Sequence, residues 1–342
     1  MEFGIGMFGD LTFDKKKGEF QSPQERLNEM IAQVKLAEEV ELDAFVLGEH
    51  HRPDYAVSSP EIVLAALATV TRKIKLASGV TVLSSADPVK VFQDFTTVDL
   101  LSNGRAEIVA GRGSFTESFP LFGYNLEDYN ELFEEKLNLL LQLNNEEVVN
   151  WEGKFRASIK NQIIYPRPEQ KLPVWIAVGG TPESVFRAAK LGLPIIFAII
   201  GGMPKQFQPL VNFYKEQYKA HGHDMNKMQI AVHSHSFITN TQAELTEKYY
   251  PYYAAQMDRI GSQRGWPKYS QMQFLGGVSP EGALFMGEPN AVADKLLQTI
   301  ELFGLTRFAA HIDVGGPKHV DMMKAIELFG TKVVPQVKKA LQ

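Results

Sequence analysis

The chain has 342 residues, of which 44% are hydrophobic and 22% charged, and its formal net charge is -5. This composition predicts a globular protein with a sizeable core and argues against a nucleic acid or an anionic membrane surface as a partner. The lack of cysteine excludes disulfides, thiolate metal sites and cysteine nucleophiles. The first residues do not have the pattern of a signal peptide, and no apolar run is long enough to cross a membrane, so we expect a cytoplasmic location.

Eight short apolar segments predict β-strands, and a helical pattern follows each of them. The segments are residues 3–7, 44–48, 74–83, 106–110, 174–178, 195–200, 230–239 and 308–314. Such near-continuous apolar runs are typical of parallel strands that are buried on both faces. Eightfold alternation predicts an α/β protein with a (β/α)₈ TIM barrel in a single domain, residues 1–342. An open doubly wound sheet is the alternative.

Two segments interrupt the alternation of strands and helices. Residues 148–165 follow the fourth helix and contain the run 151–155, which predicts a hairpin between two short strands. Residues 241–286 form a long insertion after the seventh strand. Insertions of that length in a compact domain are usually functional lids or disordered, and we expect a lid.

Titratable residues follow the second strand at the position where barrels place their active sites. Glu49, His50 and His51 come directly after this apolar segment. Imidazoles there could donate hydrogen bonds to an anionic reactant or move protons. A solvated loop that happens to contain histidines is the alternative interpretation.

Two further strand ends carry the features of a phosphate site. Arg112 follows the fourth strand between two glycines, which allow close approach to a ligand while the guanidinium binds an anion with two hydrogen bonds. Gly179 and Gly180 follow the fifth strand and lead to Thr181, the expected cap of a helix whose free N–H groups favour phosphate. An arginine paired with a carboxylate is the alternative for Arg112.

The third and eighth strands add weaker candidates. Gly79 interrupts the third strand, and a strand glycine often marks close approach of a ligand. His311 and Asp313 share a face of the eighth strand, and Asp313 is nearer the carboxyl end, so we expect it to reach the site. A satisfied structural pair is the equal alternative.

A metal site is not expected from this pattern. His233 and His235 share a face of the seventh strand, and a metal would need a third ligand such as His311 or Asp313. No trio of ligands has the spacing of a known metal motif.

The same motifs, in order, resemble the bacterial-luciferase-like family of flavin-dependent monooxygenases. The resemblance is carried by segments 49–51, 79–83, 87–90, 99–105 and 111–113, and it covers nearly the whole chain apart from residues 241–286. It implies a TIM barrel that binds reduced FMN noncovalently. A separate NAD(P)H:flavin reductase often supplies the reduced flavin in such systems. The implied chemistry is oxygen addition to the flavin, giving a peroxyflavin that oxidises a small organic substrate in a dry pocket.

The resemblance also assigns roles to individual residues. Arg112 matches the family's phosphate-binding arginine, and residues 179–181 match its second phosphate loop. His50 matches a histidine that the luciferases need for activity. Gly79 and Val80 fall where the family carries a bulged, often cis, peptide beneath the isoalloxazine ring.

Two positions depart from the luciferase pattern. Ile199 stands where luciferase α-chains carry tryptophan, and Gly179 stands where they carry an acidic residue. These departures count against light emission and a long-chain aldehyde substrate. A deazaflavin-dependent oxidoreductase and a flavin-binding protein without turnover are the alternatives. An unrelated barrel hydrolase would leave Arg112 unexplained.

The helix after the second strand predicts a homodimer. Residues 60–71 are apolar nearly all the way round, including Ala65 and Ala66, and the next helix adds Val91, Phe92 and Phe95. An outer barrel helix normally shows a polar face to water. Exposed apolar patches mark association surfaces, and two-fold dimers are the commonest assemblies. A solvent-facing alanine stripe is the alternative.

Overall fold

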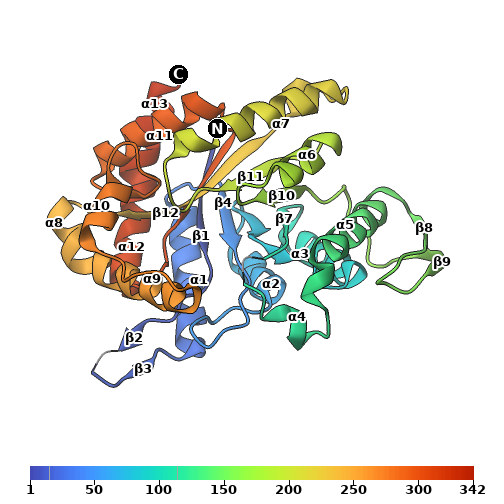
Figure 1. Cartoon of the computed structure of the whole chain (residues 1–342), viewed down its shortest axis with the longest axis horizontal. Helices are drawn as coiled ribbons and strands as arrows, with labels where there is room; N and C mark the ends of the chain where they lie inside the picture. Colours follow the sequence, from blue (N-terminus) through green and yellow to red (C-terminus); the bar gives the residue numbers. More distant parts are fainter. Residues whose placement is uncertain (15, 114) are drawn as a thin grey trace.

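The computed structural model describes residues 1–14, 16–113 and 115–342. Its centre is a ring of eight parallel strands (Figure 1). Pairing between β7 and β10 closes the ring, so the barrel is confirmed and the open sheet is wrong. In ring order the strands are β1 (Glu2–Met7), β4 (Ala44–Leu47), β5 (Lys75–Ser78), β7 (Ala106–Gly111), β10 (Val174–Val178), β11 (Ile195–Ala198), β12 (Ile230–Ile238) and β14 (Arg307–His311).

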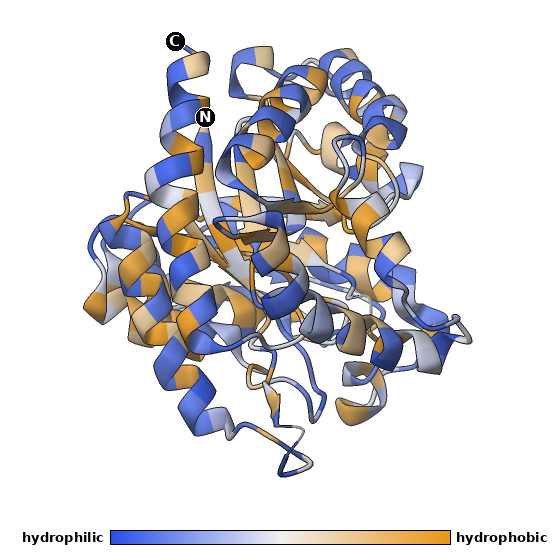
Figure 2. Ribbon diagram, turned by 90° about the vertical axis from the view of Figure 1, so that its left-hand side faces the viewer, coloured by the Kyte–Doolittle hydropathy of each residue, from blue (hydrophilic) through white to orange (hydrophobic). Residues whose placement is uncertain are grey.

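An outer layer of helices covers the strands (Figure 2). The main apolar core is formed by buried side chains from both the strands and these helices. Prolines open many of these helices, as predicted. Ser22 caps the first by accepting a hydrogen bond from the Glu25 N–H at 3.2 Å. Among the described residues, no helix combines the length and apolar character that a membrane span requires. The outer helices are α1 (Pro23–Glu39), α2 (Pro60–Val70), α3 (Pro88–Ser102), α5 (Tyr129–Asn145), α6 (Pro182–Lys190), α7 (Gln208–Ala220), α11 (Pro289–Phe303), α12 (His319–Leu328) and α13 (Val334–Ala340), with the π-helix η5 (Phe329–Val333) between the last two.

Side chains also fill the barrel axis. Trp175 is buried there, and the guanidinium of Arg307 lies 4.6 Å from the centre of its ring. Arg307 in turn pairs with buried Glu107 at 2.5 Å. The barrel axis is therefore a packed core and not a pore.

The third predicted strand is divided in two. A cis peptide between Gly79 and Val80 separates β5 from β6 (Thr81–Val82). A Cβ atom on Gly79 would overlap the side chain of Val46 on β4, so this position admits only glycine. The predicted interruption at Gly79 is therefore confirmed.

Several short elements lie in the loops between the barrel strands and the outer helices. The predicted hairpin after α5 is present as β8 (Val148–Trp151) and β9 (Ile159–Ile163). A second hairpin, β2 (Phe13–Asp14) with β3 (Glu19–Phe20), was not predicted. The remaining short helices are α4 (Ser118–Leu121), η1 (Leu126–Asp128), η2 (Pro204–Phe207) and η3 (Met225–Lys227).

The long insertion after β12 is helical and packed. It contains α8 (Gln242–Glu244), the π-helix η4 (Leu245–Tyr249), α9 (Tyr250–Arg264) and α10 (Gln271–Val278), and ends in β13 (Phe285–Gly287), which pairs with β12. The insertion shares an apolar core with the barrel, called here the insertion core. Its buried members are Phe237, Leu245, Tyr249, Tyr253, Phe274, Leu284, Met286, Val314, Met322 and Ala325.

The surface expected to form a dimer differs in detail from the prediction. Val91, Phe92 and Phe95 are buried in the core beneath α3, so their assignment to an exposed patch is wrong. Helical spacing turns them toward the strands while their neighbours face water. The apolar side chains that α2 and α3 expose are instead Ile62, Ala66, Val70, Leu100 and Leu101.

Candidate active site

A cavity of about 660 Å³ lies at the carboxyl ends of β1, β11 and β12, beneath the insertion. Its polar lining residues include Asp10, His235 and Gln256. Small-molecule sites are typically concave and apolar with a few placed polar groups, and this cavity has that character. The aromatic part of the lining is Phe8, Tyr55, Phe115, Tyr253, Trp266 and Tyr269.

Arg112 follows β7 and contacts three polar side chains from two other elements. It donates to Asn130 Oδ1 at 2.6 Å, to Thr181 Oγ1 at 3.2 Å and to Ser184 Oγ at 3.1 Å. Its guanidinium also lies 5.2 Å from the centre of the Tyr129 ring. Among the described residues it makes no ion pair with a carboxylate, so the alternative interpretation of this arginine fails.

The turn between β10 and α6 completes this arrangement. A Cβ on Gly179 would have no atom within 4 Å, and Gly180 adopts a φ of +128°, which favours glycine. Thr181 occupies the cap position, but its side chain makes no capping bond. It donates instead to Ser184 Oγ at 2.9 Å. The predicted N-cap position of Thr181 is therefore confirmed, but its side chain does not accept a hydrogen bond from the first N–H groups of α6. We call Arg112, Asn130, Thr181 and Ser184 the anion cradle.

The segment that contains the cis peptide packs against Gly111 of β7, the residue before Arg112. A Cβ on Gly111 would lie 2.8 Å from the Val80 side chain, so the two segments pack as closely as glycine allows. The Val82 N–H donates to Glu49 Oε2 at 3.0 Å, which ties this segment to the end of β4. The other carboxyl oxygen of Glu49 lies 2.8 Å from His51 Nε2. Glu49 and His51 thus form a pair that supports the peptide.

His50 is packed among three aromatic rings. Its ring centre lies 4.7 Å from that of Phe8, 4.4 Å from Tyr55 and 4.9 Å from Phe115. Burial lowers the pKa of His50 to about 3, and nearby positive charge adds to the shift. Its Nε2 atom is buried and has no hydrogen-bond partner among the described residues. The solvated-loop interpretation is therefore wrong, and the imidazole is neutral at physiological pH.

Asp313 is placed differently from the expectation. β14 ends at His311, and the Asp313 side chain lies in the following loop with no exposed surface. It accepts from the Phe8 N–H at 3.1 Å and the Gly9 N–H at 2.8 Å, and it pairs with buried Arg26 at 3.0 Å. These bonds engage the carboxylate in holding the loop after β1. His311 Nε2 also lies 3.0 Å from Asp313 Oδ1, so the structure favours the satisfied structural pair of His311 and Asp313.

Three further histidines lie below His50. His233 and His311 are 3.1 Å apart between ring nitrogens, and His235 reaches the Tyr253 hydroxyl at 3.0 Å. Burial, followed by the electrostatic effect of the neighbouring His311, lowers the pKa of His233 to about 3 and that of His235 well below its usual range. His233 and His235 are therefore neutral near pH 7.

The sequence interpretation missed four residues of this site. Ser184 stands three residues after Thr181, where helical spacing puts both at the same helix start, so spacing could have found it. Asn130 lies inside a long helical pattern. Phe8 and Asp10 follow β1 without a motif. Those three had no signal, because only the folded barrel brings them to the site.

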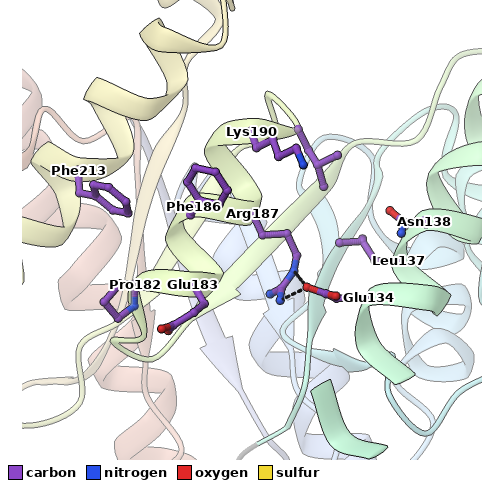
Figure 3. A pocket seen from close by; sticks show the side chains of 10 residues that line it. Glu134, Leu137, Asn138, Pro182, Glu183, Phe186, Arg187, Lys190 and Phe213 are labelled. Carbon is purple, nitrogen blue, oxygen red and sulfur yellow. Dashed lines mark hydrogen bonds and ion pairs between the residues drawn. The ribbon is translucent and has the colours of Figure 1, made fainter. Parts of the chain in front are cut away.

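A separate groove of about 500 Å³ lies on the outside of the barrel between α5, α6 and α7 (Figure 3). The ion pair between Arg187 and Glu134, 2.7 Å long, crosses it, and Phe186 and Phe213 form its apolar wall. It shares no lining residue with the cavity described above.

Comparison with known proteins identifies relatives over the full length of the chain. An uncharacterized protein, y4vJ, from Sinorhizobium fredii is 25% identical over 98% of both chains. The alkanal monooxygenase alpha chain of Photobacterium leiognathi is 22% identical over 93% of this chain and 95% of its own.

Solved structures confirm the fold. Monooxygenase RslO1 from Streptomyces bottropensis superposes with a TM-score of 0.84 at 21% identity, over 98% of this chain and 99% of its own. The FMN complex of the oxygenating constituent of 3,6-diketocamphane monooxygenase from Pseudomonas putida gives 0.77 at 18% identity, over 98% of both chains. Coenzyme F420-dependent tetrahydromethanopterin reductase from Methanopyrus kandleri gives 0.74 at 20% identity, over 98% and 99%. The fold thus occurs with either flavin.

The sequence profile of the luciferase-like monooxygenases matches residues 1–320, nearly the entire chain. This match agrees with the closed barrel, the cis peptide and the arginine after β7. The chain therefore belongs to the luciferase-like monooxygenase family.

Proposed function

We propose that this protein is an FMN-dependent monooxygenase that oxidises a small, mostly apolar organic substrate. The observation that carries the proposal is the anion cradle, in which Arg112, Thr181 and Ser184 converge at a helix start beside the cis peptide. Two hydroxyls and a guanidinium at the positive end of a helix dipole are donors that suit a phosphate monoester. The donor set therefore fits the phosphate of FMN.

The remaining parts of the site suit the same assignment. Val80 packs closely against Gly111, directly before Arg112, and would lie beside the ring of a flavin whose phosphate is in the anion cradle. Bound reduced FMN supplies the electrons with which oxygen is activated. His50 holds a neutral imidazole whose Nε2 has no hydrogen-bond partner within residues 1–14, 16–113 and 115–342, so this atom is available to donate or accept one proton.

The cavity would hold the organic substrate. Its aromatic lining excludes water, which protects a reactive oxygen species from unproductive release. Glu49 and His51 orient the loop that carries His50. Asp313 and Arg26 hold the loop after β1 that carries Phe8, one wall of the cavity.

Anaerobic titration tests the cofactor. We expect reduced FMN to bind at least tenfold more tightly than riboflavin, because only FMN carries the phosphate. Oxygen should then reoxidise the bound FMN. Tight binding of reduced coenzyme F420 without FMN binding would instead support a deazaflavin-dependent oxidoreductase. FMN binding with no oxygen consumption and no turnover would support a flavin-binding protein.

A further inference from the structure

Asp10 is a buried carboxyl group that has no role in the proposed mechanism. It follows β1, lines the cavity and has only 3% of its surface exposed. Its Oδ2 accepts from the Gly315 N–H at 2.8 Å, whereas its buried Oδ1 has no hydrogen-bond partner among the described residues. A buried charged oxygen without a partner is costly, so this group is either neutral or completed by a bound molecule.

A second carboxyl group lies beside it. Polar side-chain atoms of Asp10, Asp313 and His311 all lie within 4.8 Å of one another. Arg26 donates to the Asp313 carboxylate at 3.0 Å, but it reaches Asp10 only at its backbone carbonyl, at 3.1 Å. The charge of one buried carboxylate disfavours the ionisation of a second carboxyl group next to it.

The hydrogen bonds decide which of the two carries the charge. Asp313 accepts from the backbone N–H groups of residues 8 and 9 and from Arg26, whereas the Asp10 side chain accepts from one backbone N–H. Burial, followed by the charge of Asp313, raises the pKa of Asp10 well above its ordinary value. Although burial opposes it, His311 and Arg26 hold the pKa of Asp313 below its ordinary value.

The same three side chains also have the spacing of cation ligands. A divalent ion there would sit next to the buried Arg26 guanidinium, which already neutralises Asp313. Repulsion between the two cations in a low-dielectric interior opposes that arrangement. A proton on Asp10 removes the excess negative charge without this penalty.

We propose that Asp10 is a carboxylic acid in the folded protein and donates a hydrogen bond to an uncharged oxygen acceptor of the molecule in the cavity. The negative charge of Asp313 disfavours an anionic group at that point, and the aromatic lining accommodates the apolar remainder. The substrate would therefore be an uncharged, largely apolar molecule with an oxygen acceptor. This conclusion rests on the proposed function only because the cavity is taken as the substrate site.

Other titratable groups face Asp10 from the elements packed around it and set its protonation. They are Asp313 and His311 from β14 and its loop, Arg26 from α1, Asp54 and Tyr55 from the segment after β4, Tyr249 from η4, and His235 and Tyr253 across the cavity.

Infrared difference spectroscopy tests the protonation directly. At pH 7 the protein should show a band of an un-ionised carboxyl group that is absent from Asp10→Asn. The matched control Asp294→Asn, an exposed position on α11, should retain it. Identical spectra of the wild type and Asp10→Asn in this region would overturn the proposal.

The pH dependence of stability gives a second measurement. A carboxyl whose folded pKa is raised keeps its proton in the folded state but loses it on unfolding, so its stabilising effect fades as pH rises from the unfolded value toward the folded one. In that window the unfolding constant of the wild type relative to Asp10→Asn should rise about tenfold per pH unit. A ratio independent of pH between 5 and 8 would contradict a protonated Asp10.

Ligand binding tests the hydrogen bond itself. Acetophenone carries an oxygen acceptor and ethylbenzene of similar shape does not, and the fluorescence of Trp266 in the cavity wall reports on both. We expect a three- to tenfold preference for acetophenone, as one neutral hydrogen bond of about 0.5–1.5 kcal/mol gives. Asp10→Asn should keep the preference through its amide N–H, and Asp10→Ala should lose it. If Asp10→Ala kept the preference for acetophenone over ethylbenzene, Asp10 would not be the hydrogen-bond donor. A separate measurement of FMN affinity tests the proposed cofactor, so a failure of the FMN proposal can be distinguished from a failure of the Asp10 proposal.

Discussion

Arg112 and Ser184 are 72 residues apart in the sequence, yet the guanidinium donates to the Ser184 hydroxyl at 3.1 Å. β7 and β10 are neighbours in the ring, so the loop after one meets the helix start after the other. The bond occupies donors and acceptors that an incoming phosphate can take over. Without a ligand, the cradle is thus held together by its own polar groups.

Replacing Arg112 with alanine should weaken FMN binding about tenfold or more, since hydrogen bonds to charged groups contribute about 1.5–3 kcal/mol. Riboflavin binding should change little, because riboflavin has no phosphate. Titration of both flavins against the variant checks this. Arg187→Ala, one helical turn further along α6 from Ser184, is the matched control and should bind both normally. An equal loss for the two flavins would show that Arg112 does not bind the phosphate.

Ser184→Ala removes one cradle hydroxyl and leaves the guanidinium. Because a single hydrogen bond typically contributes about 0.5–3 kcal/mol, FMN affinity should fall by a smaller factor than in Arg112→Ala. The two substitutions share one ligand group and contact each other, so their effects should not add. Additive losses of binding free energy in the double variant would mean that the side chains act on separate sites.

His50→Ala should bind reduced FMN normally but alter its reoxidation by oxygen about tenfold or more, because positioned proton donors contribute at least that much. Stopped-flow absorbance of the bound flavin gives the rate. The pKa of about 3 places the imidazole in its neutral form throughout pH 5–8, so this group should add no pH dependence in that range. A reoxidation rate and product yield equal to those of the wild type would remove His50 from the mechanism.

The buried histidines make unfolding sensitive to acid. His233 has a folded pKa of about 3 against an ordinary value of 6.5, so between these values the unfolded state binds the additional proton. Stability contributed by this group is therefore lost as pH falls through this window, by about 1.4 kcal/mol per pH unit. Urea unfolding in a pH-stat at pH 5 should consume about one proton fewer for His233→Asn than for the wild type. Equal proton uptake would mean that His233 is charged when folded.

A homodimer through α2 and α3 remains our prediction, now assigned to different side chains. Ile62 is 67% exposed and Ala66 lies on the same helix face, so charge introduced at either position would disrupt apolar contact. Sedimentation of Ile62→Glu and Ala66→Glu should give monomers, while Lys73→Glu, outside that face, should remain dimeric. A monomeric wild type at micromolar concentration would dispose of the idea.

The barrel could be predicted because its evidence is local and repeated. Each buried parallel strand is an apolar run, and each helix start carries proline or a capping side chain, as Ser22 does. The insertion could not be predicted as helical. Its apolar residues pack against β12 and α12 in the insertion core. The sequence of the insertion has no regular spacing of apolar residues that would indicate this shared core.

The candidate site could be predicted in part for the same reason. Arg112, His50 and Gly79 stand in short motifs directly after strands, and all three lie at the carboxyl end of the barrel. Asp313 stands in an equally suggestive position, but Arg26 and the loop after β1 enclose it. Distinguishing a buried partner from an accessible group requires the contacts, which sequence spacing does not contain.

Tyr253 belongs to two structures at once, since it lines the cavity and is packed in the insertion core against Tyr249 and Phe274. A substitution that reshapes the cavity at this position also removes an aromatic ring from the core that holds the insertion on the barrel. A single substitution at Tyr253 therefore changes both the substrate specificity and the thermal stability of the protein. Laboratory evolution toward a new substrate should find fewer tolerated changes at Tyr253 than at Met257 or Ile260, which line the same cavity outside the buried part of that core.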